Sequence, residues 1–261
     1  MVIISVINNK GGVGKTTIVQ NLAIALARKK LKIGIIDFDP QANLSNVFEQ
    51  RNENGPDLVS VISSSEPITT ETFRPTYDKN VFILPNLKDI NTKLFNKIDI
   101  FTQNTLLKSK LIQGEPDFDF ILIDTPPSLE LQTVNALTAS DYILIPIEYE
   151  AFSIDGIDTV KAFYSGAKNS GTNPKLEILG VLATHVDKRL SITDEMLKEL
   201  QSKLGNYLFK TEIRTSSMYR EAQKHNKNIF NFKPKLNPFG TKKCVEDFES
   251  LANEILKRLK K

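Results

Sequence analysis

The sequence predicts an α/β protein with a single doubly wound, mostly parallel sheet flanked by helices. Short runs recur that are apolar at every position, and such strands are covered on both faces, as in a parallel sheet with crossover helices. Helical patterns separate the later runs. The chain has 261 residues, 40% of them apolar and 25% charged, and no linker, repeat or low-complexity tract divides it. We therefore expect one domain over residues 1–261.

The first expected strand is residues 2–7, and a glycine-rich loop and a helix starting near Thr16 follow it. Further strands are expected at residues 32–37, 81–85, 118–124, 142–147 and 176–183. Helices are expected around residues 130–140, 154–168, 191–204 and 248–261. Residues 50–80 carry the weakest pattern, so we expect a surface excursion there.

Composition excludes several classes of protein. The one cysteine, Cys244, rules out an internal disulfide and any zinc or cluster site built from several cysteines of one chain. His185 and His225 have no metal-like partners nearby in sequence. The N-terminus lacks the pattern of a signal peptide, and no apolar stretch approaches the length of a membrane span. We expect a cytoplasmic protein.

Charge is unevenly distributed along the chain. The formal net charge is +3, but residues 200–243 hold ten Lys or Arg against two Glu, a local charge of +8. The remainder therefore sums to −5. This asymmetry indicates an anionic partner near the C-terminal third, although a solvated basic surface would show the same composition.

Residues 8–17, NNKGGVGKTT, end like a phosphate-binding loop. The pattern G-x-x-x-x-G-K-[ST] requires a glycine where this chain has Asn9, and a second lysine, Lys10, stands beside it. The loop lies between an expected strand and an expected helix, as phosphate binding requires. Its glycines let successive N–H groups point toward phosphate oxygens. We expect nucleotide contacts from Lys10, Gly11, Gly12, Val13, Gly14, Lys15, Thr16 and Thr17.

Three side chains of this loop have distinct expected partners. Lys15 would reach the β- and γ-phosphates, Thr16 would bind Mg²⁺, and Thr17 could donate to the α-phosphate. The start of the helix adds its dipole to the attraction of the anion.

Carboxylates follow two other expected strands. FDFILID ends at Asp124 in the Walker B arrangement, and IIDFDPQANLS places Asp37 and Asp39 at the end of the second strand. Ligands of open α/β sheets bind at the carboxyl ends of the strands. Thr16, Asp37 and Asp124 are therefore candidate metal ligands, and a carboxylate here could also serve the attacking water.

These motifs resemble the ParA/MinD group of deviant Walker A ATPases. KGGVGKTT, DFDPQAN and FILIDTPPS occur in the family's order, and the similarity extends over nearly the whole chain. DPQAN and the spacing of Glu150 and Gly156 are more similar to the ParA partition branch. The resemblance implies ATP, Mg²⁺ and a nucleotide-sandwich homodimer. Catalytic roles carried over are Lys10 as the signature lysine that reaches the partner's ATP, Lys15, and Asp39 as the residue that promotes hydrolysis.

The resemblance also implies non-specific DNA binding, association with the nucleoid, and a ParB-like partner that stimulates hydrolysis. Residues 210–228 stand where the family carries an I-P-R-N-V-R-L-S-E-A-like motif, but its two arginines fall on Thr215 and Met218. Neighbouring cations are the replacements that we expect to contact DNA: Lys203, Arg214, Arg220, Lys224 and Lys227.

Two other functions on this scaffold are weighed against partition. A MinD-like membrane cycle would use the amphipathic stretch 248–261, but a packed terminal helix shows the same spacing and no disordered linker precedes it, so no membrane partner is expected. The second alternative function is that of a metabolic ligase or kinase. An iron-protein electron carrier is disfavoured because Cys244 alone cannot hold a shared cluster that requires two cysteines per subunit. Residues 184–190 occupy the approximate position that reads the base, with Thr184 where the family commonly has asparagine.

Overall fold

The computed structural model describes residues 1–48, 55–87, 102–128, 130–148, 154–187, 189, 192–234 and 238–260. The described strands form one seven-stranded sheet in the order β3-β4-β2-β5-β1-β6-β7. The strands are β1 (Val2–Val6), β2 (Ile33–Asp37), β3 (Arg74–Pro75), β4 (Val81–Leu84), β5 (Phe120–Asp124), β6 (Tyr142–Glu148) and β7 (Glu177–Thr184). Neighbouring strands pair in parallel except β3 with β4. The predicted fold class is confirmed, and only the two-residue β3 carries too short a pattern to be found.

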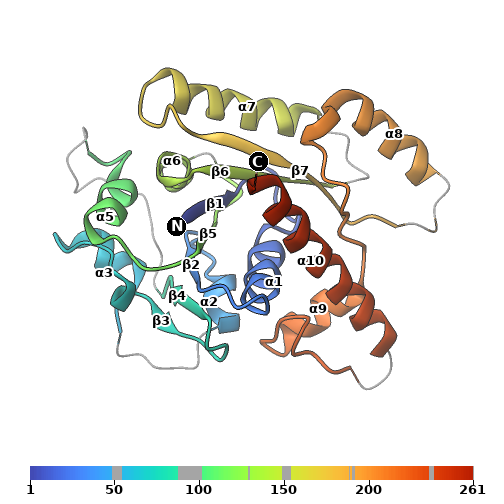
Figure 1. Cartoon of the computed structure of the whole chain (residues 1–261), viewed down its shortest axis with the longest axis horizontal. Helices are drawn as coiled ribbons and strands as arrows, with labels where there is room; N and C mark the ends of the chain where they lie inside the picture. Colours follow the sequence, from blue (N-terminus) through green and yellow to red (C-terminus); the bar gives the residue numbers. More distant parts are fainter. Residues whose placement is uncertain are drawn as a thin grey trace.

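Helices cover both faces of this sheet (Figure 1). The described helices are α1 (Lys15–Ala27), α2 (Asn43–Phe48), α3 (Leu58–Ser63), α5 (Leu106–Gly114), α6 (Leu131–Ala139), α7 (Ile154–Asn169), α8 (Ile192–Leu204), α9 (Ser217–Lys224) and α10 (Pro238–Leu259). Short 3₁₀ turns are η1 (Thr70–Thr72) and η2 (Gly205–Tyr207). Helices α1 and α10 pack together on one side, whereas α6 packs against α5 and α7 on the other.

Burial on both faces explains the continuous apolar runs. Ile4 of β1 belongs to the cluster formed with α1 and α10, whereas its neighbour Ile3 packs into the cluster of α3, α5 and α6. Successive side chains of a strand point to opposite faces, so a strand covered by helices on both sides has no solvent-facing position to fill with a polar residue.

Residues 55–80 do not form the expected surface excursion. Leu58 and Ile62 of α3, and then Ile68 and Phe73, are buried in the cluster of α3, α5 and α6. Helix α3 has only six residues, which is too short for a helical period to be recognised, and Asp57 begins it with a capping box. The prediction of a surface excursion is therefore wrong for this part, while residues 49–54 lie outside the described residues.

The terminal helix α10 begins at Pro238, ten residues before the predicted start. The apolar face predicted for it packs on α1 and the sheet. In that face Phe248, Leu251, Ala252 and Ile255 are fully buried and Leu256 and Leu259 are partly buried, and Cys244 extends the buried face toward the start of the helix. Its amphipathic pattern therefore reflects a helix that faces the core, as the packed-helix alternative predicts. Within the described residues, no helix is long and apolar enough to cross a bilayer.

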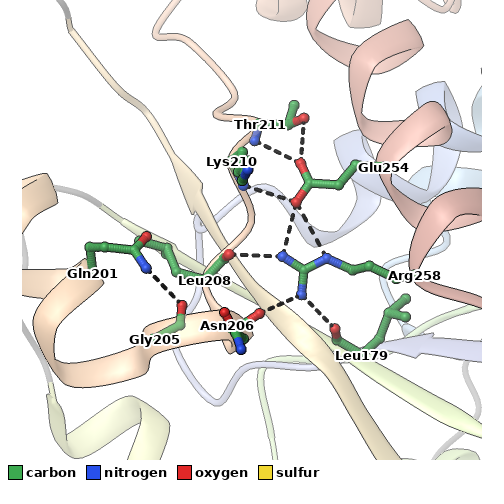
Figure 2. A network of polar contacts seen from close by, with 9 residues as sticks. All are labelled: Leu179, Gln201, Gly205, Asn206, Leu208, Lys210, Thr211, Glu254 and Arg258. Carbon is green, nitrogen blue, oxygen red and sulfur yellow. Dashed lines mark hydrogen bonds and ion pairs between the residues drawn. The ribbon is translucent and has the colours of Figure 1, made fainter. Parts of the chain in front are cut away.

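Arg258 fastens α10 to the end of the sheet (Figure 2). Its guanidinium pairs with Glu254 at 2.9 Å and lies 3.9 Å from the centre of the Phe209 ring. Glu254 in turn accepts hydrogen bonds from the two backbone N–H groups of residues 210–211. The guanidinium also donates to three carbonyl oxygens, those of Leu179 (3.1 Å), Asn206 (3.0 Å) and Leu208 (2.8 Å).

Candidate active site

The strand order places three sequence motifs at one edge of the sheet. Strand β5 lies between β1 and β2. In the register of these strands, Asp124 is level with Asp37 of β2 and with Val6 of β1. The glycine-rich loop that follows β1 therefore begins beside both carboxylates, at the edge where ligands of open α/β sheets bind.

Backbone conformation and one buried hydroxyl shape the loop. Gly12 and Gly14 have φ of 82° and 89°, in the left-handed region that favours glycine, and Gly14 immediately precedes α1. The Thr184 hydroxyl at the end of β7 lies 3.1 Å from the Val13 carbonyl oxygen. Thr184, which we placed in the region that reads the base, is 1% exposed and supports the loop through this contact.

Lys15 is held inside the loop. Its side chain is buried, and Nζ donates to the carbonyl oxygens of Asn8 at 2.9 Å and Lys10 at 3.0 Å. Burial lowers the pKa of Lys15, and the carboxylates of Asp124 and Asp39 oppose this shift. The Asn8 side chain also accepts a hydrogen bond from the Lys10 N–H at 2.8 Å, which closes the start of the loop. The ammonium is therefore positioned before any anion arrives.

A hydrogen-bond network holds the aspartate that ends β2 and the one that follows it. Asp37 accepts hydrogen bonds from the Ser45 N–H and hydroxyl, at 2.8 and 2.7 Å, and from the Asp39 N–H at 3.1 Å. Burial nevertheless raises the pKa of Asp37 to about 7. The Asn86 amide donates to the Asp39 carbonyl oxygen at 2.9 Å. Ser45 and Asn86 were not predicted from the sequence as residues of the site, although Ser45 lies within the quoted IIDFDPQANLS motif.

Asp124 is the least compensated charge among the described residues of the site. It is fully buried, and neither carboxylate oxygen has a hydrogen bond of acceptable geometry, although the Thr16 hydroxyl lies close enough to lower its pKa. Burial and then the charge of Asp37 raise the pKa of Asp124 well above its ordinary value. The described residues contain no cluster of three His, Cys, Asp or Glu that could hold a metal by itself. A buried carboxylate without a partner fits a divalent cation that takes most of its other ligands from bound phosphates and water.

Two adjoining cavities lie beside the loop. The first, of about 530 Å³, is lined by residues 11–12 and 14–17, by Asp39, and by Gln223 of α9. The second, of about 480 Å³, lies between the end of β7 and α9 and includes His185 and Tyr219 in its wall. Gly12, Gly14, Thr17 and Gln223 line both cavities. A ligand could therefore extend from the phosphate loop into the second cavity.

The five cations expected to contact DNA lie in different environments. Arg214 forms a two-pronged pair with Asp247 of α10, both distances 2.6 Å, and this pair raises the pKa of the guanidinium. Lys203 is paired with Glu199 one turn earlier on α8, at 2.5 Å. The other three are exposed on α9 and just after it, and they are Arg220, Lys224 and Lys227. Arg214 thus anchors the terminal helix, a role that its position in the sequence did not reveal.

The basic segment after α9 is tied to α1. The Gln20 amide donates to the Lys227 carbonyl oxygen at 3.0 Å, and the Ile229 N–H donates to the Asn21 side chain at 2.8 Å. Because α1 starts at the phosphate loop, one helix contacts both the candidate nucleotide site and the segment after α9 that includes Lys227.

Lys10 lies at the rim of the loop, and its ammonium forms an ion pair with Glu148 at the end of β6. The second oxygen of Glu148 lies 3.0 Å from Nδ1 of His185. Both partners escaped the sequence interpretation because they are more than 130 residues from Lys10 in the chain. Glu150, quoted above for its spacing to Gly156, lies outside the described residues.

Comparisons with known proteins agree with this geometry. The family model described as an AAA domain matches residues 1–178. The chromosome-partitioning ATPase Soj of Treponema pallidum is 31% identical over 258 residues, covering 97% of this chain and 96% of that protein. The sporulation initiation inhibitor protein Soj of Bacillus subtilis is 30% identical, covering 97% of each chain.

Solved structures share the fold. A putative plasmid partition protein of Borrelia burgdorferi bound to AMPPNP has a TM-score of 0.77 at 24% identity, covering 98% of this chain and 99% of that one. Cobyrinic acid a,c-diamide synthase of Mycobacterium smegmatis, with ADP and magnesium, has a TM-score of 0.79 at 23% identity, covering 100% and 96%. By its sequence similarity over nearly the full length, this chain belongs to the ParA/Soj family of P-loop ATPases.

Proposed function

We propose that this chain is a partition ATPase that moves plasmid or chromosomal DNA. ATP and Mg²⁺ bind at the loop, two chains pair around their nucleotides, and the homodimer binds DNA without sequence preference. A ParB-like partner stimulates hydrolysis and so releases the dimer. The observation that carries this proposal is one loop with two lysines in different places, Lys15 buried within it and Lys10 at its rim. The similarity to Soj proteins supports it.

The chain's own groups supply the positioning that phosphoryl transfer needs. Lys15, already inside the loop, binds the β- and γ-phosphates, while the N–H groups of residues 11–17 surround them. Thr16 and Asp124 would hold Mg²⁺, and Asp37, whose oxygens already accept hydrogen bonds from its own network, would lie beside that site, level with Asp124 on the next strand. Mg²⁺, when bound, neutralises charge on the transferring group. Asp39 lines the same cavity and orients the attacking water.

The second cavity suits the nucleoside. It continues from Thr17 along the end of β7 to α9, where Ile213 and Tyr219 offer apolar surface and the Ser216 hydroxyl offers a polar contact. The wall thus combines apolar surface with several polar side chains, and small-ligand sites typically hold an apolar ring in this way and fix its orientation with polar contacts. We propose that the base lies there.

Three exposed cations form the proposed DNA contact: Arg220, Lys224 and Lys227. They lie on or just after α9, next to the cavities, and contacts from Lys or Arg to phosphates give affinity that falls steeply with salt. Arg214 is left out because Asp247 occupies its guanidinium. Association with the nucleoid in cells follows from this contact.

The decisive experiment measures DNA binding and ATP turnover together. Co-sedimentation with non-specific DNA and ATPase rates would be compared at about 50 and 200 mM salt, where phosphate contacts lose most of their affinity. We expect DNA to be bound only with ATP and only at the lower salt. Anionic liposomes are the control for a MinD-like membrane cycle, which the core-facing α10 disfavours. If the ATP state fails to bind DNA at low salt, the partition function is wrong.

The role of Lys10 has its own test. In an Asp39→Ala background that slows hydrolysis, we expect ATP to produce a dimer on gel filtration. Lys10→Ala should bind ATP as a monomer and fail to dimerise, whereas Lys15→Ala should fail to bind ATP. A Lys10→Ala chain that dimerises normally with ATP would contradict the sandwich mechanism.

A further inference from the structure

Lys10 already has an anionic partner in its own chain. Its ammonium pairs with Glu148, and the other oxygen of that carboxylate faces Nδ1 of His185 at 3.0 Å. The side chain of Glu148 is only 22% exposed, compared with 38% for Lys10 and 43% for His185. Glu148 is the last residue of β6 and His185 directly follows β7, whereas Lys10 lies in the glycine-rich loop that follows β1, and these three strands are neighbours in the sheet. Two of the three positions are therefore set by the ends of adjacent strands.

The carboxylate of Glu148 is also close to the phosphate loop. Its Oε1 lies 4.0 Å from the position that a Cβ would take on Gly12. His185 adopts a left-handed conformation with φ of 55°, which is uncommon for a residue with a side chain and occurs where the surrounding structure imposes it. Burial raises the pKa of Glu148, but hydrogen bonds from Lys10 and His185 outweigh this effect, so its pKa lies below the ordinary value. Glu148 is thus a fixed negative charge beside the loop at neutral pH.

Glu148 and a nucleotide on another chain are both anions, so they compete for the single Lys10 ammonium. We infer that Glu148 is a positioning residue that holds Lys10 on its own chain and thereby sets the ATP threshold at which two chains pair. The inference rests on the proposed function, in which Lys10 reaches the partner's nucleotide. Pairing then exchanges one anion for another: each Lys10 leaves Glu148 and binds phosphate, and His185 remains beside the carboxylate.

The size of the effect follows from the exposure of the ion pair. Partly exposed ion pairs stabilise proteins weakly, and a symmetric dimer must break two of them. Removing the Lys10–Glu148 ion pair should therefore lower the dissociation constant of the ATP-dependent dimer by about 2- to 30-fold, since both protomers contribute. Glu148→Gln keeps the size of the side chain and an oxygen that can face His185, while it removes the charge that competes for Lys10.

The first experiment compares dimerisation in the Asp39→Ala background. Analytical ultracentrifugation across a series of ATP and protein concentrations gives the dimer dissociation constant for the parent and for Glu148→Gln. The matched control is Glu199→Gln, which removes a similar ion pair from Lys203 on α8. We expect Glu148→Gln to lower the dissociation constant by about 2- to 30-fold and Glu199→Gln to leave it unchanged.

The second experiment measures the hold on Lys10 without nucleotide. Brief acetylation of the monomer, followed by mass spectrometry of lysine peptides, reports how freely each amine reacts. Glu148→Gln should increase the rate at Lys10 several-fold and leave Lys203 unchanged, and Glu199→Gln should do the reverse. A merely structural role for Glu148 would not produce this selectivity.

The outcomes distinguish a failure of this inference from a failure of the proposed function on which it rests. If the parent forms no dimer with ATP, the proposed function and the inference both fail. If the parent does form a dimer and Glu148→Gln dimerises equally or more weakly, only the inference is overturned. Equal reactivity of Lys10 in the parent and in Glu148→Gln also overturns it.

Discussion

Replacing Asp124 by asparagine should stabilise the nucleotide-free protein and remove its response to Mg²⁺ and ATP. Asp124 is fully buried, has no hydrogen bond of acceptable geometry among the described residues, and is level with Asp37 on the next strand. Burial first, and then the charge of Asp37, raise its pKa well above the ordinary value. The folded wild-type chain therefore either keeps a buried negative charge or must bind a proton to neutralise it, and both lower its stability above the ordinary pKa of the group. A neutral asparagine of equal size avoids this cost.

The magnitude can be worked from the paired strands. At a strand spacing of about 4.8 Å and an effective dielectric constant of about 20, two carboxylates repel by about 3 kcal/mol. For Asp37 itself, the raised pKa of about 7 in place of 3.8 corresponds to about 4 kcal/mol, which is the same order as this repulsion. We therefore expect Asp124→Asn to increase the free energy of unfolding by about 2–4 kcal/mol at pH 8. For a chain of this size that raises Tm by roughly 4–7 °C.

The pH dependence gives this prediction its sign. A carboxyl whose pKa is raised by folding is protonated more readily in the folded chain, so it costs stability once the pH rises above its unfolded value near 4. The cost of Asp37 reaches its full size near pH 7, where its folded pKa lies. The advantage of Asp124→Asn should therefore be absent at about pH 4 and grow as the pH rises.

Denaturant unfolding with EDTA, at several pH values between 4 and 8, measures the difference between Asp124→Asn and wild type. Asp117→Asn, at a carboxylate whose side chain is 89% exposed, is the matched control and should change little. With Mg²⁺ and ATP added, the wild type should gain stability and Asp124→Asn should not. A variant that is less stable than wild type at pH 8, or whose advantage is the same at every pH, would refute the reasoning.

Three further substitutions distinguish anchoring cations from DNA-binding ones. Arg214→Ala leaves the largely buried carboxylate of Asp247 unpaired and should lower the free energy of unfolding by about 1–3 kcal/mol in denaturant titrations. Arg220→Ala should leave stability unchanged, weaken DNA binding, and reduce the slope of log affinity against log salt by about 1, measured by fluorescence anisotropy. Arg258→Ala should cost about 2–4 kcal/mol by thermal unfolding, because three carbonyls and an ion pair lose their partner, whereas the exposed neighbour Lys257→Ala should cost almost nothing. Equal losses for Arg258→Ala and Lys257→Ala, or a folding defect in Arg220→Ala, would contradict this assignment.

Local patterns in the sequence were enough to predict the sheet and the phosphate loop. The six long strands are apolar at nearly every position, and the loop between β1 and α1 is marked by glycines and lysines within ten residues. The carboxylates Asp37 and Asp124 could be placed because each ends an apolar strand, and parallel strands bring their ends to one edge. These features depend on neighbours in the chain, so a single sequence contains them.

Features that depend on distant pairs could not be predicted in this way. The pairing of Lys10 with Glu148, and that of Arg214 with Asp247, arise only when the strand order and the terminal helix are known. The short helix α3 has too few residues to show a helical period, and its burial comes from the neighbouring strands and helices. The basic segment shows a related limit. Its charge composition made Arg214 a candidate for DNA contact, whereas in the folded chain Arg214 is paired with Asp247.

The tie between α1 and the basic segment offers a native spectroscopic reporter. The amide hydrogen of Ile229 is donated to the side chain of Asn21, deep on the helix that begins at the phosphate loop. Its exchange with deuterated solvent therefore requires the segment after α9 to detach from α1. The protection factor of this one amide can be followed as nucleotide is added. It converts to the free energy that separates α1 from the cationic segment.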